Sequence, residues 1–420
     1  MNLLQLSWKN ILHKPSSTLL SLVLFALGVG LVSLLMLVNR QLQEKFEKNL
    51  AGIDMVVGAK GSPLQLILSS MYHIDAPTGN VAISDVKAFF NPKHPVIGRA
   101  VPLSLGDNYR GYRIVGTTFD FFDLYNAEPA QGRRWKAVNE VVIGAAVADA
   151  LGLEIGNTFN SSHGFVIDDN LEHADAEPFK VAGILRPTGA VVDQLILTSP
   201  QSIWAVHGHD HTEEEGEDHH DHAHADYRDL NKPLIEYAGE SITAVLVQFK
   251  ARNAMTLNMP RNINENTNLQ AATPAWEINR LYAILGDSAL ALQVLAIIII
   301  AVSGLSVFLS LYSSLRDRRY ELALMRVMGA SRGKLFALIL LEGLLLAAMG
   351  CIIGLVLSHA GMEVFARVLE SSYRYSFTGA LFLKEEIWLV LAALGVGLLA
   401  AFIPAVQARN TDISQTLAEG

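Results

Sequence analysis

Long apolar runs separate the polar parts of this chain of 420 residues. Four of them have the length at which a helix crosses the ~30 Å hydrocarbon core of a bilayer, namely Thr18–Val38, Ala289–Tyr312, Leu335–Ser358 and Ile387–Val406. None of the four contains Lys, Arg or Asp, and Glu342 is their single carboxylate. We therefore predict four transmembrane helices. The first run is long for a signal-peptide core and no small-residue cleavage site follows it, so we interpret it as a retained anchor rather than a cleaved signal.

Basic residues orient these helices, because cytoplasmic loops are enriched in Lys and Arg. Lys9 and Lys14 precede the first run and Arg409 follows the fourth. The short loop between the second and third runs carries six bases, Arg316, Arg318, Arg319, Arg326, Arg332 and Lys334. This predicts a cytoplasmic amphipathic segment (1–17), a cytoplasmic loop (313–334) and a cytoplasmic tail (407–420). The long segment 39–288 and the short loop 359–386 then lie outside.

The external segment alternates short strands and helices, which predicts a large α+β domain. Residues 40–50 continue the first helix as a polar stalk, and a helix with Thr273 as N-cap and Pro274 in its first turn leads into the second. Ser84 is the expected N-cap of another helix. Alternation at period two over 109–119 predicts one strand, and further strands are expected in EVVIG, FKVAGIL, DQLILTS and SITAVLVQF. We expect a core built from both ends of the segment, with a β-rich insertion at about 130–235.

Composition narrows the functional class. Apolar residues make up 51% of the chain and charged residues only 17%, against about 25% charged in soluble proteins. The net charge of −9 makes a nucleic-acid partner unfavourable, and the single cysteine excludes an intramolecular disulfide and a Cys-based zinc site. The nearest approach to a phosphate-binding loop, at 329–335, is one residue short and lacks the Ser or Thr that binds Mg²⁺. We predict no ATPase activity, no other enzymatic activity and no directly bound cofactor.

A loop rich in histidine and acid occupies residues 207–229. Nine acidic residues and one basic residue give it most of the chain's negative charge. Imidazole and carboxylate groups together suit Zn²⁺, Cu²⁺ or Ni²⁺, and alternate residues of an extended chain face the same side. One hypothesis is exchangeable zinc binding, and the other is a solvated loop without a selected function. The candidate ligands are His207, His209, His211, His219, His220, His222 and His224.

The cytoplasmic loop predicts a short amphipathic helix that is stopped by Gly329 and followed by a new helix start at Ser331. Such a helix can lie on the lipid surface or dock in a groove of a cytoplasmic partner.

Two features of the membrane runs concern packing. Gly350 and Gly354 allow another helix to approach closely, within one chain or between two, and Gly397 with Ala401 forms a similar pair. Glu342 is costly in a membrane helix. We expect a structural pairing with Arg326 or Lys334 rather than contact with a substrate.

The loop and the run after it, RDRRYELALMRVMGASRGKLFALILLEGLLLAAMG, resemble the signature of FtsX/MacB-type ABC transporter permeases. The layout of one span, a large external domain and three further spans is similar too, as is the stretch 140–197. The histidine loop resembles inserts in zinc-linked, MacB-like permeases of Gram-negative bacteria. The resemblance implies an inner-membrane permease with a MacB-like periplasmic core domain. A proline common near 411–413 in the family's C-terminal signature is absent here.

The resemblance also implies partners and a mechanism. These are a homodimer, two separate cytoplasmic ATPase subunits that hold ATP and Mg²⁺, membrane lipid, and a periplasmic partner protein. The short helix would then transmit ATPase work to the external domain (mechanotransmission). The residues assigned to this coupling are Arg319, Glu321, Leu324, Arg326, Gly329 and Ser331.

Three functions remain open at this point. The first is a MacB-type permease linked to zinc or other metal handling. The second is a lipoprotein-releasing permease, which needs an external surface that shelters acyl chains. The third is a membrane-anchored metal sensor without transport, and binding of an ATPase separates it from the other two.

Overall fold

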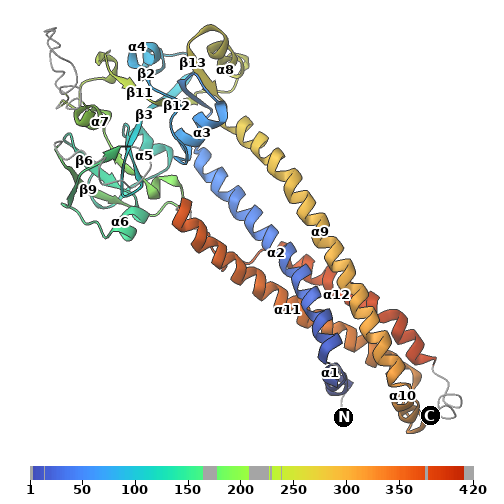
Figure 1. Ribbon diagram of the computed structural model, residues 1–420. Helices are drawn as coiled ribbons and strands as arrows, with labels where there is room; N and C mark the ends of the chain where they lie inside the picture. The colour runs from blue at the N-terminus through green and yellow to red at the C-terminus, as the bar shows by residue number, and fades with distance from the viewer. Residues whose placement is uncertain are drawn as a thin grey trace. The chain divides into compact units, whose positions relative to one another are not determined.

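The computed structural model describes residues 3–13, 15–163, 177–207, 227, 229–237, 239–373 and 377–410. The chain divides into two compact units, one of Met1–Leu42 with Ile284–Gly420 and the other of Gln43–Ala283. Figure 1 labels the helices of both and several of the strands.

The first unit is helical. It contains α1 (Leu3–His13), most of α2 (Pro15–Leu50), most of α9 (Pro274–Asp317), α10 (Arg319–Val327), α11 (Arg332–Tyr373) and α12 (Glu385–Arg409). Among the described residues, four helical stretches are long and apolar enough to cross a membrane: Thr18–Leu50, Leu290–Asp317, Arg332–Val368 and Glu385–Arg409. Each predicted apolar run lies within α2, α9, α11 or α12, which confirms the four membrane helices. The predicted stalk and the helix start at Pro274 are also present, because α2 continues to Leu50 and α9 begins at Pro274.

Small residues let the membrane helices approach closely. A Cβ atom on Gly354 of α11 would lie 2.7 Å from the carbonyl oxygen of Ala26 in α2. A Cβ atom on Gly350 would lie 2.7 Å from the ring of Phe25 in α2. The pair Gly397 and Ala401 of α12 likewise packs on α11. The small residues found in the sequence therefore pack within one chain, the first of the two possibilities.

The second unit combines a large sheet with short helices (Figure 1). Its helices are α3 (Pro63–Met71), α4 (Ile83–Val86), α5 (Asp120–Leu124), α6 (Ala145–Leu151), α7 (Pro200–His207) and α8 (Ala254–Asn266). Its strands are β1 (Met55–Ala59), β2 (Val81–Ala82), β3 (Ile97–Tyr109), β4 (Tyr112–Gly116), β5 (Pro129–Gly132), β6 (Glu140–Ile143), β7 (Thr158–Phe159), β8 (Ser162–His163), β9 (Phe179–Leu185), β10 (Ile196–Thr198), β11 (Ser241–Ile242), β12 (Ala244–Phe249) and β13 (Leu269–Ala272). Short 3₁₀ helices cover Lys87–Phe90, Val191–Gln194 and Leu234–Glu236.

The sheet is built from distant parts of the chain. Its strand order is β13-β1-β12-β3-β4-β10-β6-β9-β5, with β7 on β9 and β8 on β3, while β2 and β11 form a separate pair. Strands from the two ends of the second unit are antiparallel neighbours, with β1 between β12 and β13. The strands between 129 and 198 continue the sheet beyond β4, where β10 runs parallel to β4 and β9 parallel to β6.

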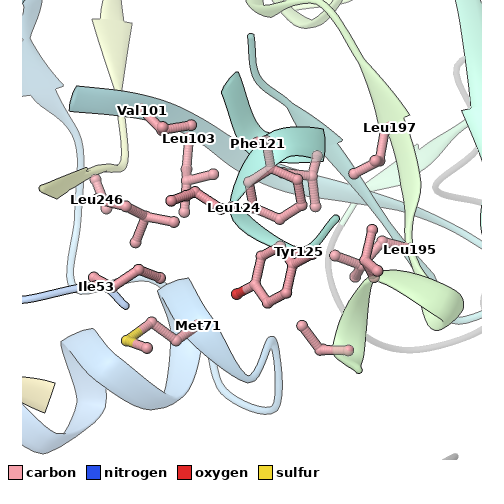
Figure 2. Close-up of a cluster of buried hydrophobic side chains, with 14 of the residues drawn as sticks. Ile53, Met71, Val101, Leu103, Phe121, Leu124, Tyr125, Leu195, Leu197 and Leu246 are labelled. Carbon is pink, nitrogen blue, oxygen red and sulfur yellow. The ribbon is translucent and has the colours of Figure 1, made fainter. Parts of the chain in front are cut away.

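One hydrophobic core lies between the sheet and its helices (Figure 2). Val101, Leu103 and Leu246 of β3 and β12 are fully or almost fully buried. They cluster with Phe121 of α5 and Met71 of α3. The alternate positions of each strand supply these side chains because successive residues point to opposite faces.

Two local predictions are wrong. The stretch 109–119 is not one strand, because Arg110 and Gly111 have φ of +48° and +78° and form a turn. The Asn108 side chain accepts the Gly111 N–H at 2.9 Å, which stabilises the turn before β4 begins at Tyr112. Ser84 is not an N-cap either. The cap position of α4 is Ala82, and the Ser84 hydroxyl donates to Asp85 inside the helix instead.

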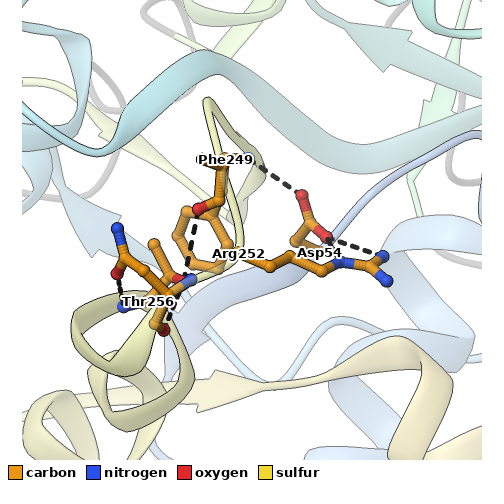
Figure 3. Close-up of polar contacts among 6 residues, drawn as sticks. Asp54, Phe249, Arg252 and Thr256 are labelled. Atoms are coloured by element: carbon orange, nitrogen blue, oxygen red, sulfur yellow. Dashed lines mark hydrogen bonds and ion pairs between the residues drawn. The ribbon is translucent and has the colours of Figure 1, made fainter.

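Polar contacts fix the end of β12 near the start of β1 (Figure 3). The Asp54 carboxylate accepts the Phe249 N–H at 2.9 Å and the Arg252 guanidinium at 3.1 and 3.2 Å. Asn253 then begins α8 with a capping box that involves Thr256. These contacts stop the strand where its register with β3 shifts, between Gln248 and Phe249.

Candidate functional site

The short helix α10 occupies the loop between the second and third membrane helices. It begins after Arg318, and its C-cap is Met328. Gly329 follows with φ of +99°, a conformation that favours glycine. The Ser331 hydroxyl accepts the Lys334 N–H at 3.3 Å, so Ser331 caps the start of α11. The amphipathic helix, its stop at Gly329 and its restart at Ser331 are thus present as predicted.

The two faces of α10 differ sharply. Leu322 and Ala323 are almost fully buried, and Leu322 packs in a cluster with Leu315 of α9 and Leu335 of α11. The other face presents large apolar side chains to the surroundings. Their exposed fractions are 44% for Leu324, 60% for Val327, 73% for Met328 and 52% for Tyr320. One face of α10 therefore belongs to the helical unit, and the other is an apolar surface that the described residues leave exposed.

The six residues assigned to coupling all lie on α10 or directly after it. Arg319, Glu321, Leu324, Gly329 and Ser331 are exposed, whereas Arg326 is half-buried. Glu321 contacts Arg318, with 3.0 Å between the Nε and Oε2 atoms. We call the exposed side chains of Tyr320, Leu324, Val327 and Met328 the α10 outer face.

Glu342 has different partners from those predicted. Its side chain is only 3% exposed, and its Oε1 atom lies 3.6 Å from Nη1 of Arg318. The same Oε1 accepts a hydrogen bond from the Asn10 amide of α1. The structural pairing expected for Glu342 is present, but the expected partners Arg326 and Lys334 are wrong. Arg318 reaches Glu342 because it stands at the junction of α9 and α10, whereas no local sequence pattern pointed to Asn10.

A second buried carboxylate was not among the residues predicted from the sequence. Glu386 lies in the first turn of α12 and is 5% exposed. Its Oε1 accepts the Ser33 hydroxyl at 3.0 Å and lies 3.3 Å from Nε2 of His359. Ser33 also contacts the hydroxyl of Ser358 at 2.8 Å. The sequence offered one hint of this site, the position of Glu386 directly before an apolar run. Its burial depends on the packing of three helices, which the sequence does not reveal.

The second unit, Gln43–Ala283, contains a large open cavity of about 1020 Å³. Apolar rings on its wall include Phe89, Phe119 and Trp135, and the rings of Phe119 and Trp135 lie 4.9 Å apart. Arg99 and Asp120 also line it, 3.6 Å apart. The wall is therefore mixed, with aromatic surface next to charges of both signs.

Of the seven candidate zinc ligands in the histidine loop, the structure describes His207. His207 is the last residue of α7, and its Nε2 lies 3.2 Å from Oδ1 of the buried Asp107. The other candidate ligands, His209, His211, His219, His220, His222 and His224, lie outside the described residues. Within the described part of the chain, no group of three or more His, Cys, Asp or Glu side chains could hold a metal ion. Metal binding by the loop stays a prediction.

Comparison with known protein families gives two matches. Residues 18–220 match the model of a MacB-like periplasmic core domain. Residues 293–413 match the model of an FtsX-like permease C-terminal region. The first range includes most of α2 and most strands of the large sheet, and the second includes α10, α11, α12 and much of α9. The two matches together cover most of the chain.

Proposed function

The chain belongs to the FtsX/MacB-type ABC permeases, and from this premise we propose that it couples ATP hydrolysis by a separate cytoplasmic subunit to movement of its external unit. As a member of this family it is an inner-membrane protein. The family implies an ABC transporter with a cytoplasmic ATPase partner. In the proposal, the α10 outer face is the surface on which that ATPase docks, and two permease copies assemble with two ATPase subunits.

The observation that carries the proposal is the two-faced burial of α10. Leu322 and Ala323 hold this helix of nine residues in the unit, while Leu324, Val327 and the C-cap residue Met328 remain exposed. An amphipathic helix that offers apolar anchors suits a hydrophobic groove of a partner protein. The basic residues of this loop favour the cytoplasmic side of the membrane, where ATP is hydrolysed.

The direct test replaces two anchors with charges. Leu324→Asp with Val327→Asp should lower the affinity for the co-expressed ABC ATPase at least about 100-fold and so abolish most of its co-purification. Each of the two apolar side chains would contribute about 1.5–3 kcal/mol when docking buries it, and 1.4 kcal/mol is tenfold in affinity.

The matched control uses a helix of the external unit. Met255 and Leu257 of α8 are 63% and 73% exposed, so Met255→Asp with Leu257→Asp introduces the same charges on a similarly exposed apolar pair. This control should retain the ATPase. Wild-type co-purification by the α10 variant would contradict the docking role. A wild-type chain that binds no ATPase at all would favour the membrane-anchored sensor instead.

Metal handling is the proposed purpose of this coupling. Its support is the composition of residues 207–229, because imidazole and carboxylate groups suit Zn²⁺. Lipoprotein release is the weaker alternative. The large external cavity has Arg99 and Asp120 on its wall, and an acyl chain would leave those charges without water. The cavity therefore fits an amphipathic ligand better than a lipid tail.

A further inference from the structure

Arg318 contacts three helices, α1, α10 and α11, at the end of the helical unit that carries α10. Its Nη2 atom donates to Oδ1 of Asn10 in α1 at 2.6 Å. Its Nε atom donates to Glu321 in α10 at 3.0 Å. Its Nη1 atom lies 3.6 Å from Glu342 in α11. A planar guanidinium presents its donors in a fixed fork, so these three contacts together allow one arrangement of the three helices.

Burial of Arg318 and Glu342 raises the free-energy cost of breaking these contacts. The side chains of Arg318 and Glu342 are only 11% and 3% exposed. Asn10 closes the cluster, because its amide donates to Glu342 while its oxygen accepts from Arg318. Loss of one member would leave a buried charge or donor without its partner, which is far more costly than loss of an exposed pair.

Apolar contacts join the same three helices. Leu6 of α1 packs against the cluster that contains Leu322 of α10 and Leu338 of α11. The Ser7 hydroxyl of α1 also donates to the carbonyl oxygen of Leu338 at 3.4 Å. The helix α1 is thus attached to α10 and α11 by both polar and apolar contacts.

We propose that Arg318 is a positioning residue that locks α1 and α10 into one coupling element, so that the N-terminal helix moves with the docking helix. The proposal rests on the docking role proposed for α10. Movement of α10 then reaches the first membrane helix as well as the third. The link is short, because α1 ends at His13, α2 begins at Pro15 and the Thr18 hydroxyl donates to the Ile11 carbonyl oxygen at 3.1 Å.

The first readout is a distance distribution in the full-length permease alone. Spin labels on Trp8→Cys in α1 and Arg319→Cys in α10 report it, in a background where the single native cysteine is removed by Cys351→Ala. Arg318→Lys keeps the positive charge beside Glu342, but an ammonium cannot reach three partners at once. Asn10→Ala keeps both charges and removes only the link to α1. Both variants should widen the distribution at least twofold, whereas Arg332→Lys, at an exposed position of the same loop, should leave it unchanged.

The second readout is turnover in the complex with the ATPase. Arg318→Lys and Asn10→Ala should lower kcat for ATP about fivefold at unchanged KM and unchanged co-purification, because docking persists while coupling is lost. A narrow distance distribution in both variants overturns the lock. A widened distribution with wild-type kcat overturns its role in coupling. If Arg318→Lys does not fold, Asn10→Ala decides alone. Failure of the docking proposal is distinguishable, because the α10 outer-face variant would then keep the ATPase whatever the distances show.

Discussion

The contact between Gly354 in α11 and the backbone of α2 makes a sharp prediction about stability. A Cβ atom at Gly354 would lie 2.7 Å from the Ala26 carbonyl oxygen and 3.1 Å from the Gly30 nitrogen. Both are backbone atoms, which cannot rotate away as a side chain can. Gly354→Ala therefore requires the two helices to separate.

The magnitude follows from two opposing terms. Alanine is favoured over glycine inside a helix by about 1 kcal/mol, whereas overpacking a well-packed interior costs about 1–3 kcal/mol. Gly361 of the same helix supplies the reference. Apart from its own helical neighbours, no heavy atom of a described residue would lie within 4 Å of a Cβ atom there. We expect Gly361→Ala to be neutral or stabilising, and Gly354→Ala to be less stable than Gly361→Ala by about 1–3 kcal/mol.

Thermal unfolding of the full chain in detergent measures this difference. Gly30→Ala should behave like Gly354→Ala, because its Cβ would lie 2.9 Å from the Gly354 carbonyl oxygen. Gly350→Ala should be milder, since the nearest atoms belong to the side chain of Phe25. Equal midpoints for Gly354→Ala and Gly361→Ala would refute the close approach of α2 and α11.

Two further predictions concern the second unit. His73 is buried, neither of its ring nitrogens has a hydrogen-bond partner among the described residues, and burial together with Arg113 lowers its pKa to about 3 from an ordinary 6.5. The unfolded chain takes up this proton below about pH 6.5 while the folded chain does not. His73 therefore destabilises the fold increasingly as the pH falls, by about 2 kcal/mol at pH 5. The variant His73→Phe should flatten the pH dependence of the unfolding midpoint between about pH 7 and pH 5. For the histidine loop, calorimetry with ZnCl₂ at about pH 7.5 should show fewer zinc ions bound after deletion of residues 208–226. The wild type should bind zinc more weakly at pH 5, where protons compete for imidazoles of pKa about 6.5. Equal stoichiometry with and without the segment would leave the loop as a solvated linker.

Local properties of the chain explain which features could be predicted. The membrane helices depend on hydrophobicity summed over one continuous run, and α10 depends on the alternation of residues within about three turns. Strand β6, helix α6 and the glycine turn after it follow in the same way from the EVVIGAAVADALG pattern, and Gly152 caps the helix with φ of +62°. In each case the sequence window contains all the residues that decide the structure.

Features that depend on distant residues could not be predicted. The Arg318–Asn10 contact spans 308 positions and the Asn10–Glu342 contact spans 332. The sequence suggests nearby bases as partners of Glu342, but the packing of α1 brings Asn10 to it instead. The turn at Arg110 was missed for another reason. The alternation loses its phase there, because Tyr109 and Tyr112 are three residues apart. This break and Gly111 were the local signal for the turn, in which Arg110 and Gly111 have a left-handed backbone.

Two buried carboxylates, Glu342 and Glu386, raise the question of why an apolar helical unit retains charge. Each accepts contacts from two other helices: Asn10 and Arg318 for Glu342, and Ser33 and His359 for Glu386. Apolar groups in place of such clusters are often neutral or stabilising, so stability alone does not account for them. The glycine contacts already hold α2 and α11 together. The carboxylates instead link other helices: Glu342 links α11 to α1 and to the start of α10, and Glu386 links α12 to α2 and α11. A hydrogen bond weakens steeply when its partners are misaligned, so these links favour joint movement of the helices that they connect. The coupling proposed above depends on such joint movement.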